Sequence, residues 1–380
     1  MKIALVAGET SGDLLAGLLL DGLKTKWQSL QSFGIGGARM AERGFAAWWP
    51  SDKLAVRGYI EVLRHYREIV GIRKQLKARL LANPPDVFIG VDAPDFNLDL
   101  SRDLKQAGIK TIQFVSPSIW AWRGERIHKI KASVDHVLCI FPFEPALYAA
   151  HGISASYVGH PIASVIPLQA KRDVAREALI LLADDVVIAV LPGSRASEIQ
   201  YIGETFVQTI KLLLHARPNI KVLLPAVPLL RAQIEMQLSR LLQPLELAQV
   251  QVLQGQSHLA LAACDVSLVA SGTATLEAAL FKRPMVIAYK MNPLSWLMMR
   301  KKRYQAWVGL PNILCNDFVV PEFLQSAASP QALSRAVLKW LDDPAASSRV
   351  AERFTKLHHE LLRDTPRIAA DDVAKVMALD

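Results

Sequence analysis

A loop of small residues followed by a glutamate marks residues 270–279 as a candidate phosphate- and ribose-binding segment. The apolar run Val266–Ala270 predicts a strand, and Glu277 lies one to two turns into the helix expected after the loop. Backbone N–H groups at such a helix start can hold phosphate oxygens, and a glutamate can accept hydrogen bonds from two ribose hydroxyls. A glutamate there would also suit the helix dipole alone. The segment predicts these ligands of a nucleoside diphosphate: Ser271, Gly272, Thr273, Ala274 and Glu277.

A second turn that suits a diphosphate follows the apolar strand predicted at Val186–Leu191. Gly193 permits close backbone approach, Ser194 offers a hydroxyl, and Arg195 offers a guanidinium that can hold two phosphate oxygens. A surface arginine at a helix start is the alternative. Because this turn and Glu277 occur in the same half of the chain, together they favour a nucleotide site over a purely structural role.

Carboxylates and an amide follow a third apolar run, Val87–Val91. Asp92 comes directly after this predicted strand, at the end of the sheet where parallel α/β folds bind ligands. A carboxylate there can act as a general base or hold sugar hydroxyls. Asp95 is the alternative base, and Asp95 or Asn97 could instead cap the following helix. We expect Asp92 to be the catalytic carboxylate.

Two further strand ends in the first half offer groups that could line a cleft. The turn after Ile3–Ala7 could cradle an anion or could be a tight turn that needs small residues, and it matches neither a Walker loop nor a GxGxxG fingerprint. The tryptophans after Thr111–Val115 could stack on a sugar or an acyl chain, or could pack in the core. The acceptor or cleft residues expected from these turns and from the Asp92 segment are Glu9, Thr10, Ser11, Gly12, Asp95, Asn97, Ser116, Trp120 and Trp122.

The elements that must position these residues form an alternating pattern. Short apolar runs alternate with amphipathic, helix-like stretches, and the alternation occurs twice along the chain. Continuous apolar strands between helices are typical of a parallel sheet covered on both faces. We predict an α/β fold of two Rossmann-like, doubly wound domains facing a cleft. The expected domains are 1–165 for the acceptor and the membrane, 166–350 for the nucleotide-sugar donor, and 351–380, a helical segment that packs across the cleft or onto a second subunit.

The composition excludes several classes of protein. The 380 residues are 51% hydrophobic and 21% charged, which suits two globular cores and excludes disordered and fibrous chains. Three scattered cysteines without CxxC spacing, and no DxD or histidine cluster, predict neither disulfides nor a metal site. The sequence shows no signal segment and no apolar stretch of about 18 residues, so we expect a cytoplasmic protein without a spanning helix.

The net charge of +9 suits an anionic partner, whether nucleic acid, acidic lipid or a phosphorylated substrate, although the charge could equally serve solubility alone. Residues 53–79 carry eight Lys/Arg and two Glu around an apolar stripe at helical spacing. Such a helix can bind an anionic membrane surface, although the stripe could equally be core. The segment Trp296–Met299, followed by four cations, is a second candidate. The stripe comprises Tyr59, Val62, Leu63, Tyr66, Ile69 and Val70.

Six motifs, taken in order, resemble the lipid-A-disaccharide synthases, which are bacterial glycosyltransferases of the GT-B architecture. The resemblance runs essentially end to end, and no motif residue departs from it. It implies that Asp92 is the base and that Arg195 serves the diphosphate, and it adds Asn312 to the donor-binding residues. The motifs are Ala7–Asp13, Gly90–Asn97, Val115–Arg123, Leu191–Arg195, Ser271–Glu277 and Leu310-Pro311-Asn312.

The resemblance also implies a reaction that needs no metal or other cofactor. In this reaction 2,3-diacylglucosamine passes from UDP to the 6-hydroxyl of 2,3-diacylglucosamine 1-phosphate, with inversion, and yields a β-1,6 disaccharide and UDP. The implied location is the cytoplasmic face of the inner membrane, a homodimer is left open, and nucleic acid is not an expected partner. Two alternatives remain: a nucleotide-sugar epimerase of the same architecture, and a non-catalytic basic protein that binds membrane or nucleic acid.

Overall fold

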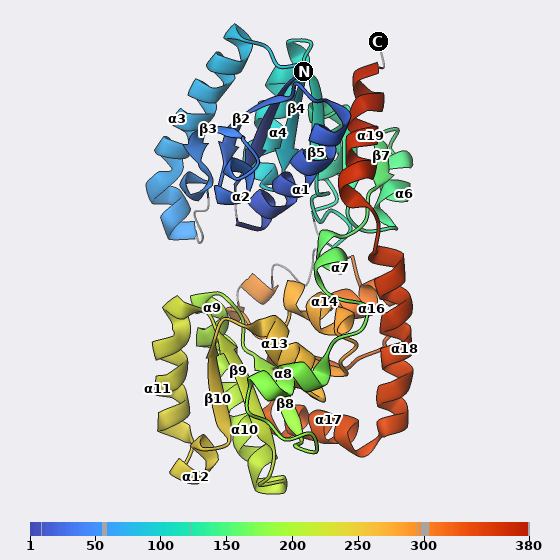
Figure 1. Cartoon of the computed structure of the whole chain (residues 1–380). Helices are drawn as coiled ribbons and strands as arrows, with labels where there is room; N and C mark the ends of the chain where they lie inside the picture. The colour runs from blue at the N-terminus through green and yellow to red at the C-terminus, as the bar shows by residue number, and fades with distance from the viewer. Residues whose placement is uncertain (9, 55–58, 122, 294, 298–303, 379–380) are drawn as a thin grey trace. The chain divides into compact units, whose positions relative to one another are not determined.

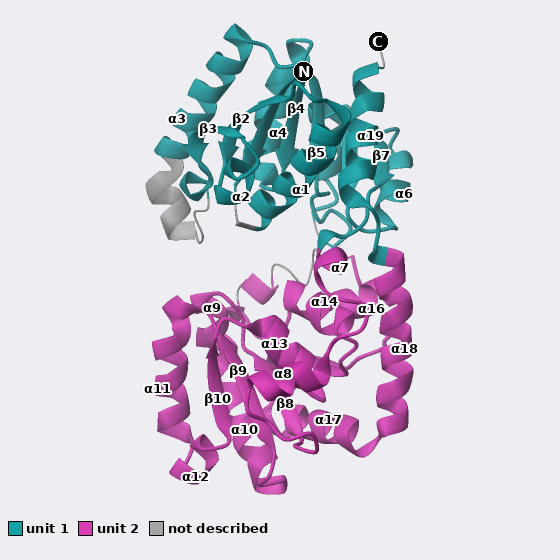
Figure 2. Ribbon diagram, viewed as in Figure 1, with its two compact units in different colours: residues 1–161, 361–380 teal, residues 162–360 magenta. Residues whose placement is uncertain are grey.

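Two parallel sheets organise the chain, each in its own folding unit (Figure 2). Residues 1–161 and 361–380 form unit 1, and residues 162–360 form unit 2, so the predicted C-terminal segment 351–380 is shared between the units. The computed structural model describes residues 1–8, 10–54, 59–121, 123–293, 295–297 and 304–378, without the side chains of residues 10 and 59–66. No helix within these ranges combines the length and the hydropathy needed to cross a bilayer.

The sheet of unit 1 has seven parallel strands in the order β3-β2-β1-β4-β5-β6-β7 (Figure 1). Its central strands are buried apolar runs, as expected where helices cover both faces. Gly90 of β4 pairs with Gln113 of β5, so the segments that follow these strands leave the sheet at the same edge. The strands are β1 (Lys2–Ala7), β2 (Gln31–Gly36), β3 (Ala46–Pro50), β4 (Val87–Val91), β5 (Lys110–Phe114), β6 (His136–Cys139) and β7 (Ser154–Tyr157).

Helices cover both faces of this sheet: α1 (Thr10–Lys26), α2 (Ala38–Ala41), α3 (Tyr59–Ala82), α4 (Pro94–Gln106), α5 (Arg126–Ser133), α6 (Glu144–Ala149) and α19 (Thr365–Ala378). Successive residues of a strand face opposite sides. Leu5 therefore packs with α1 and α19, whereas Val6 packs with α3 and α4. A Cβ on Gly22 of α1 would come within 1.9 Å of the Pro366 carbonyl oxygen, so the start of α19 docks on α1 at a glycine.

The sheet of unit 2 has six parallel strands in the order β10-β9-β8-β11-β12-β13. These strands are β8 (Val187–Leu191), β9 (Lys221–Ala226), β10 (Val250–Gln254), β11 (Val266–Ala270), β12 (Met285–Tyr289) and β13 (Glu322–Leu324). The helices include α7 (Pro161–Val165), α8 (Arg172–Ala178), α9 (Ala196–Glu198), a π-helical turn (Ile199–Gly203), α10 (Glu204–Ala216), α11 (Arg231–Leu241), α12 (Pro244–Leu247), α13 (Ser257–Ala263), α14 (Thr273–Leu280), α16 (Leu310–Cys315), α17 (Pro330–Asp342) and α18 (Pro344–Leu361).

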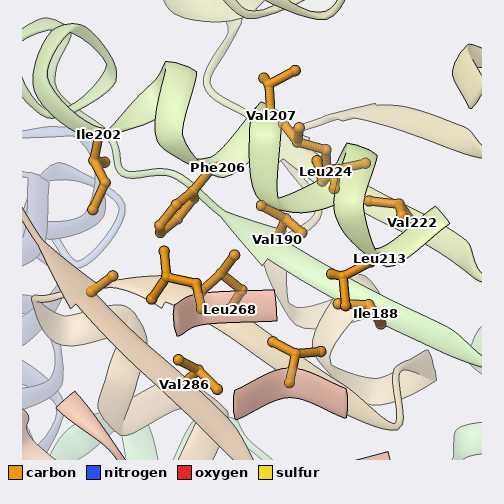
Figure 3. Packing of buried hydrophobic residues seen from close by; sticks show 14 of the residues in the cluster. Ile188, Val190, Ile202, Phe206, Val207, Leu213, Val222, Leu224, Leu268 and Val286 are labelled. Atoms are coloured by element: carbon orange, nitrogen blue, oxygen red, sulfur yellow. The ribbon is translucent and has the colours of Figure 1, made fainter. Parts of the chain in front are cut away.

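The core of unit 2 forms where α10 packs on the sheet (Figure 3). Phe206 of α10 lies over Val190 of β8 and Leu268 of β11, and all three side chains are almost fully buried. Removing an aromatic side chain from such a core costs about 3–5 kcal/mol. The predicted architecture of two doubly wound, parallel-sheet α/β units with a helical C-terminus is confirmed.

Candidate functional site

A pocket of about 530 Å³ opens at the carboxyl ends of β8, β9 and β11 in unit 2. It brings together eight of the nine residues predicted to bind a donor nucleotide, although they come from two separate motifs. These eight are Gly193, Ser194, Arg195, Ser271, Gly272, Thr273, Ala274 and Glu277. The same pocket is also lined by Leu191 and Ala270, which end the two predicted strands, and by residues that the sequence analysis did not single out, namely Glu198, Pro225, Ala226, Val227, Gly255 and Ser257.

The start of α14 forms one wall of this pocket. Gly272 precedes the helix with a φ of +150°, a conformation that side chains rarely adopt, and a Cβ placed there would meet no atom within 4 Å. The Thr275 hydroxyl donates to the Gly272 carbonyl at 2.7 Å and so fixes the first turn. The first N–H groups of a helix have no acceptor within the helix, and they carry its positive dipole end. This wall can therefore bind an anion such as a diphosphate.

Glu277 lies in α14 and faces the same pocket with a side chain that is 17% exposed. Its carboxylate is 3.3 Å from Nε2 of His258, which stands in the first turn of α13. The His258 ring in turn packs edge-on against Phe281. Sequence reasoning missed His258, because an isolated histidine carries no motif; the only signal was the Gly255–Ser257 turn after a strand.

The turn that carries Arg195 is held by a carboxylate three residues further on. Glu198 accepts hydrogen bonds from the backbone N–H groups of Ser194 and Arg195, at 2.8 and 3.2 Å, and from Nη1 of Arg195 at 3.0 Å. Burial and then the Glu198 charge raise the pKa of Tyr289, the last residue of β12, so its phenol lies close to this pair. The N–H groups of this turn thus already have an anionic partner within the protein.

Asn312 is the predicted donor residue that the structure does not bring to the pocket. Its side chain is fully buried, and its amide nitrogen donates to the Val320 carbonyl and to Glu322. Its amide oxygen accepts from the N–H groups of Val319 and Val320. The side chain therefore fixes the connection from α16 to β13 and has no atom left for UDP, so the expectation of direct contact is corrected.

In unit 1, Asp92 follows β4 in a strained conformation. Its φ is +51°, and that of the next residue, Ala93, is +40°. Such values cost free energy in residues other than glycine and are enriched at functional sites. Two buried side chains hold this strained turn by bonding the same atom, the main-chain carbonyl oxygen of Asp92. Asn97 Nδ2 donates to it at 2.9 Å and Gln113 Nε2 at 3.0 Å. The Asp92 side chain is half-buried.

Asp95 and Asn97 occupy different environments from Asp92. Asp95 is 80% exposed in the first turn of α4 and forms an ion pair of 2.6 Å with Arg126. Asn97 is fully buried, and its amide oxygen has no hydrogen-bond partner. The geometry engages the exposed Asp95 carboxylate with Arg126, whereas the Asp92 side chain is half-buried at the end of β4. Asn97 is therefore a support for Asp92, because its buried side chain exposes no surface to a substrate.

The loop after β1 lies against the Asp92 turn. A Cβ on Gly8 would come within 3.1 Å of the Ala93 Cβ, and one on Gly12 would lie 3.6 Å from the Val91 carbonyl oxygen. Ser11, between these glycines, is exposed. The structure therefore brings Ser11 and Gly12 to the same edge of the sheet as Asp92. Glu9 and the Thr10 side chain lie outside the described residues.

An aromatic cluster follows β5 and β6 at this edge. The half-buried Trp120 packs edge-on against Phe141 and Phe143, and its indole N–H donates to Glu144 at 3.0 Å. Burial raises the pKa of the Glu144 carboxyl to about 7. Ser116 is buried and bonded to the Tyr148 hydroxyl at 2.7 Å, so it is part of the scaffold. The predicted site residue Trp122 lies outside the described residues.

In the basic helix α3, side chains are described from residue 67 onward, and apolar ones among them pack against the core. Ile72, Leu76 and Leu80 are buried, and Ile69 packs against the same cluster. Arg73 and Lys77 form ion pairs with Asp99 and Asp103 of α4. These contacts support the core interpretation for Ile69, whereas the side chains of Tyr59, Val62, Leu63 and Tyr66 are outside the described set, as are residues 298–303. Within the described part of the chain, no group of three or more His, Cys, Asp or Glu could hold a metal ion.

Comparison with known proteins gives a family match over nearly the whole chain. A family model described as lipid-A-disaccharide synthetase matches residues 3–373. The chain is 62% identical to the lipid-A-disaccharide synthase of Albidiferax ferrireducens, over 99% of this chain and 97% of that relative. It is 57% identical to the enzyme of the same name from Verminephrobacter eiseniae, over 100% of this chain and 98% of the relative.

Solved structures of distant proteins share the fold. A UDP-GlcNAc 2-epimerase from Neisseria meningitidis, solved with UDP-GlcNAc bound, matches with a TM-score of 0.65 and 12% identity over 100% of both chains. A glycosyltransferase from Rickettsia africae matches with a TM-score of 0.61 and 12% identity, over 99% of this chain and 97% of the other. At these identities the likeness concerns the fold alone, and it confirms the predicted GT-B class.

Proposed function

Because the chain belongs to the lipid-A-disaccharide synthase family and is a glycosyltransferase of lipid A biosynthesis, we propose that unit 2 binds the UDP-sugar donor and that Asp92 of unit 1 activates the acceptor. The donor is UDP-2,3-diacylglucosamine, and the acceptor is 2,3-diacylglucosamine 1-phosphate. The observation that carries the donor assignment is the pocket in which the start of α14, Glu277 and Arg195 converge.

In this proposal each part of UDP has a partner in the pocket. The first N–H groups of α14 hold the diphosphate, because a helix N-terminus supplies both donors and a positive dipole end. Glu277 accepts hydrogen bonds from the ribose hydroxyls, and His258 holds its carboxylate in place. The side chain of Arg195, which is 62% exposed, extends its guanidinium to the diphosphate.

The chemical step is a single displacement. Asp92 takes the proton of the acceptor 6-hydroxyl while that oxygen forms a bond to the anomeric carbon of the donor. The bond from this carbon to the diphosphate oxygen breaks, and the electron pair leaves with UDP. Arg195 and the start of α14 stabilise the charge that develops on the leaving group. One displacement inverts the anomeric centre, which gives the β-1,6 linkage.

The acceptor-side surface of unit 1 contributes binding in the same proposal. Trp120, held by Glu144, presents an aromatic ring at the edge of the sheet that carries Asp92, where it can stack on a sugar or contact an acyl chain. The acylated substrates and the cation excess of residues 53–79 support association with an anionic membrane surface at the cytoplasmic face of the inner membrane. Residues 59–66 of α3 are the proposed contact, since Ile69 and apolar residues that follow it on this helix pack in the core.

The experiment that tests the activity is incubation of the protein with both lipid substrates, with the products identified by mass spectrometry. The expected products are the disaccharide 1-phosphate and UDP in equal amounts. An epimerised UDP-sugar with no disaccharide would favour the epimerase alternative, which the fold likeness alone leaves open. Failure to bind UDP would favour a non-catalytic basic protein.

A further inference from the structure

Glu198 occupies the turn that should present Arg195 to the donor. This carboxylate receives three hydrogen bonds, from the N–H groups of Ser194 and Arg195 and from the Arg195 guanidinium. The Glu198 side chain is only 10% exposed, whereas that of Arg195 is 62% exposed. Both residues line the nucleotide pocket. A buried carboxylate thus stands behind an exposed guanidinium in the wall of the site.

The backbone of the turn is shaped to admit this carboxylate. Gly193 has a φ of +115°, and a Cβ at this position would come within 2.3 Å of Oε2 of Glu198. Any residue other than glycine would push the carboxylate out of the turn. The chain then continues as a π-helical turn, Ile199–Gly203, and such turns are rare and frequently occur at functional sites. The glycine that the sequence analysis assigned to close phosphate approach therefore makes room for Glu198.

The hydrogen bonds to Glu198 restrict the conformation of the Arg195 side chain but leave most of that side chain exposed. One guanidinium nitrogen, Nη1, bonds Oε1 of Glu198, and the backbone of the same residue bonds Oε2. An unrestrained arginine loses side-chain entropy when a ligand fixes it, and a guanidinium held in advance loses less. The other donors of the fork remain to bind phosphate oxygens, which a guanidinium can hold in pairs.

We propose that Glu198 is the positioning residue of the donor site, which holds the 193–195 turn and aims the Arg195 guanidinium at the diphosphate. This inference rests on the proposed function, which places Arg195 at the diphosphate. In this arrangement the N–H groups of Ser194 and Arg195 serve Glu198, and the backbone donors for the diphosphate come from the start of α14. Glu198 acts through Arg195 and does not touch the substrate.

A double-mutant cycle tests the proposal by calorimetric titration with UDP. The four proteins are the parent, Glu198→Gln, Arg195→Ala and the variant with both changes. We expect Arg195→Ala to weaken UDP binding roughly 10-fold or more, as loss of a charge-assisted hydrogen bond does. Glu198→Gln should weaken binding about fivefold or more in the parent, but less than about twofold once Arg195 is absent, because interacting residues are not additive.

Glu246→Gln is the matched control for the loss of a buried capping carboxylate. Glu246 lies in the same unit with a side chain that is 11% exposed, and it accepts the N–H of Gln243 at the start of α12, three residues earlier. It does not line the pocket. We expect this variant to bind UDP like the parent, although it loses some thermal stability. Glu198→Asp keeps the charge and should recover part of the affinity, and it gives a second measurement if Glu198→Gln does not fold.

The outcomes separate this inference from the proposed function. If Arg195→Ala leaves UDP affinity unchanged, the placement of Arg195 at the diphosphate is wrong, and the positioning role is wrong with it. If Arg195→Ala weakens binding but folded Glu198→Gln does not, only the positioning role is overturned. It is also overturned if Glu198→Gln tightens UDP binding, because Glu198 would then compete with the diphosphate for the turn. Equal losses from Glu198→Gln with and without Arg195 overturn it as well.

Discussion

The side-chain amide of Gln113 donates a hydrogen bond of 3.0 Å to the main-chain carbonyl of Asp92. Gln113 lies in β5 and pairs with Gly90 of β4, and Gly90 comes two residues before Asp92. A Cβ on Gly90 would come within 2.8 Å of the Cβ of Asn97. Two amide side chains therefore converge beside a glycine and hold the same carbonyl. This support offsets the strain of the positive φ at Asp92, and it holds the backbone from which the carboxylate projects.

We expect Asp92→Asn to lower turnover by about 10²–10⁴-fold, since the asparagine cannot accept the proton of the acceptor hydroxyl. UDP affinity should stay within about twofold of the parent, because the donor pocket lies in unit 2. Steady-state kinetics and calorimetry measure the two quantities. Asp95→Asn is the control, as Asp95 is exposed and paired with Arg126. If Asp95→Asn is the inactive variant and Asp92→Asn is active, the base is Asp95.

Gln113→Leu should lower turnover at least about tenfold while the protein remains folded. The change removes one of the donors that hold the Asp92 carbonyl, and it also removes an amide oxygen that is buried without a partner, so the net loss of stability is limited. Thr111→Val is the control, because Thr111 lies on the same strand, is equally buried and bonds Ser133 and Asp135. Equal turnover in the two folded variants would remove Gln113 from the site.

Glu277→Ala should weaken UDP binding by about 1.5–3 kcal/mol, the usual contribution of hydrogen bonds to a charged group. Titration with UDP and with deoxy-UDP checks the assignment, because the variant should lose the preference for the ribose hydroxyls. Glu204→Ala, an exposed glutamate paired with Arg240 on the same unit, is the control and should leave UDP affinity unchanged. An unchanged preference in Glu277→Ala contradicts the ribose assignment.

Chelation with EDTA should leave the transferase activity unchanged. The proposed groups for the diphosphate are a helix start and Arg195, which supply the positive potential that a metal would otherwise provide. The product-mass assay in EDTA, followed by addition of magnesium, checks this. Activity that EDTA abolishes and magnesium restores would show that the leaving group depends on a metal.

The sequence predicted those parts of the site that depend on local order along the chain. Gly272 and Glu277 could be assigned because a strand, a small-residue loop and a helix follow one another within a dozen residues, and parallel strands place such loops at one edge. Glu198 was missed although its signal was present, since a glutamate at the third position of a helix often binds back to the turn before it. The position of Asp92 directly after a strand was predicted, but the strained backbone conformation of this residue was not.

Other features depend on contacts between distant segments. Gln113 reaches Asp92 only through the register of β4 on β5, and an isolated glutamine in an apolar strand gives no sign of this. Asn312 was misjudged for the opposite reason, because a motif shows which residue recurs but not where its side chain points. Its four hydrogen bonds are all used within unit 2. Packing therefore decides which motif residues face the pocket.

The buried Glu144 should make the stability of the protein depend on pH. Burial raises its pKa from the ordinary 4.5 to about 7 despite hydrogen bonds from Trp120 and the Phe141 N–H. Between these two values the folded protein keeps a proton that the unfolded chain releases, so stability falls as pH rises, and the loss is complete above about pH 7. Its size is on the order of 3 kcal/mol, at 1.36 kcal/mol for each pKa unit.

Glu144→Gln removes this titration and therefore tests it. Urea unfolding of the parent and the variant at pH 5 and pH 8 gives the difference in free energy of unfolding at each pH, and titrations common to both proteins cancel. We expect the difference to shift in favour of the variant by roughly 2–3 kcal/mol between pH 5 and pH 8. Glu204→Gln, which removes an exposed carboxylate paired with Arg240, is the control and should show a much smaller change. A difference for Glu144→Gln that stays constant with pH would mean that this carboxylate is ionised in the folded protein at both pH values, and that Trp120 is held by a charge rather than by a neutral acid.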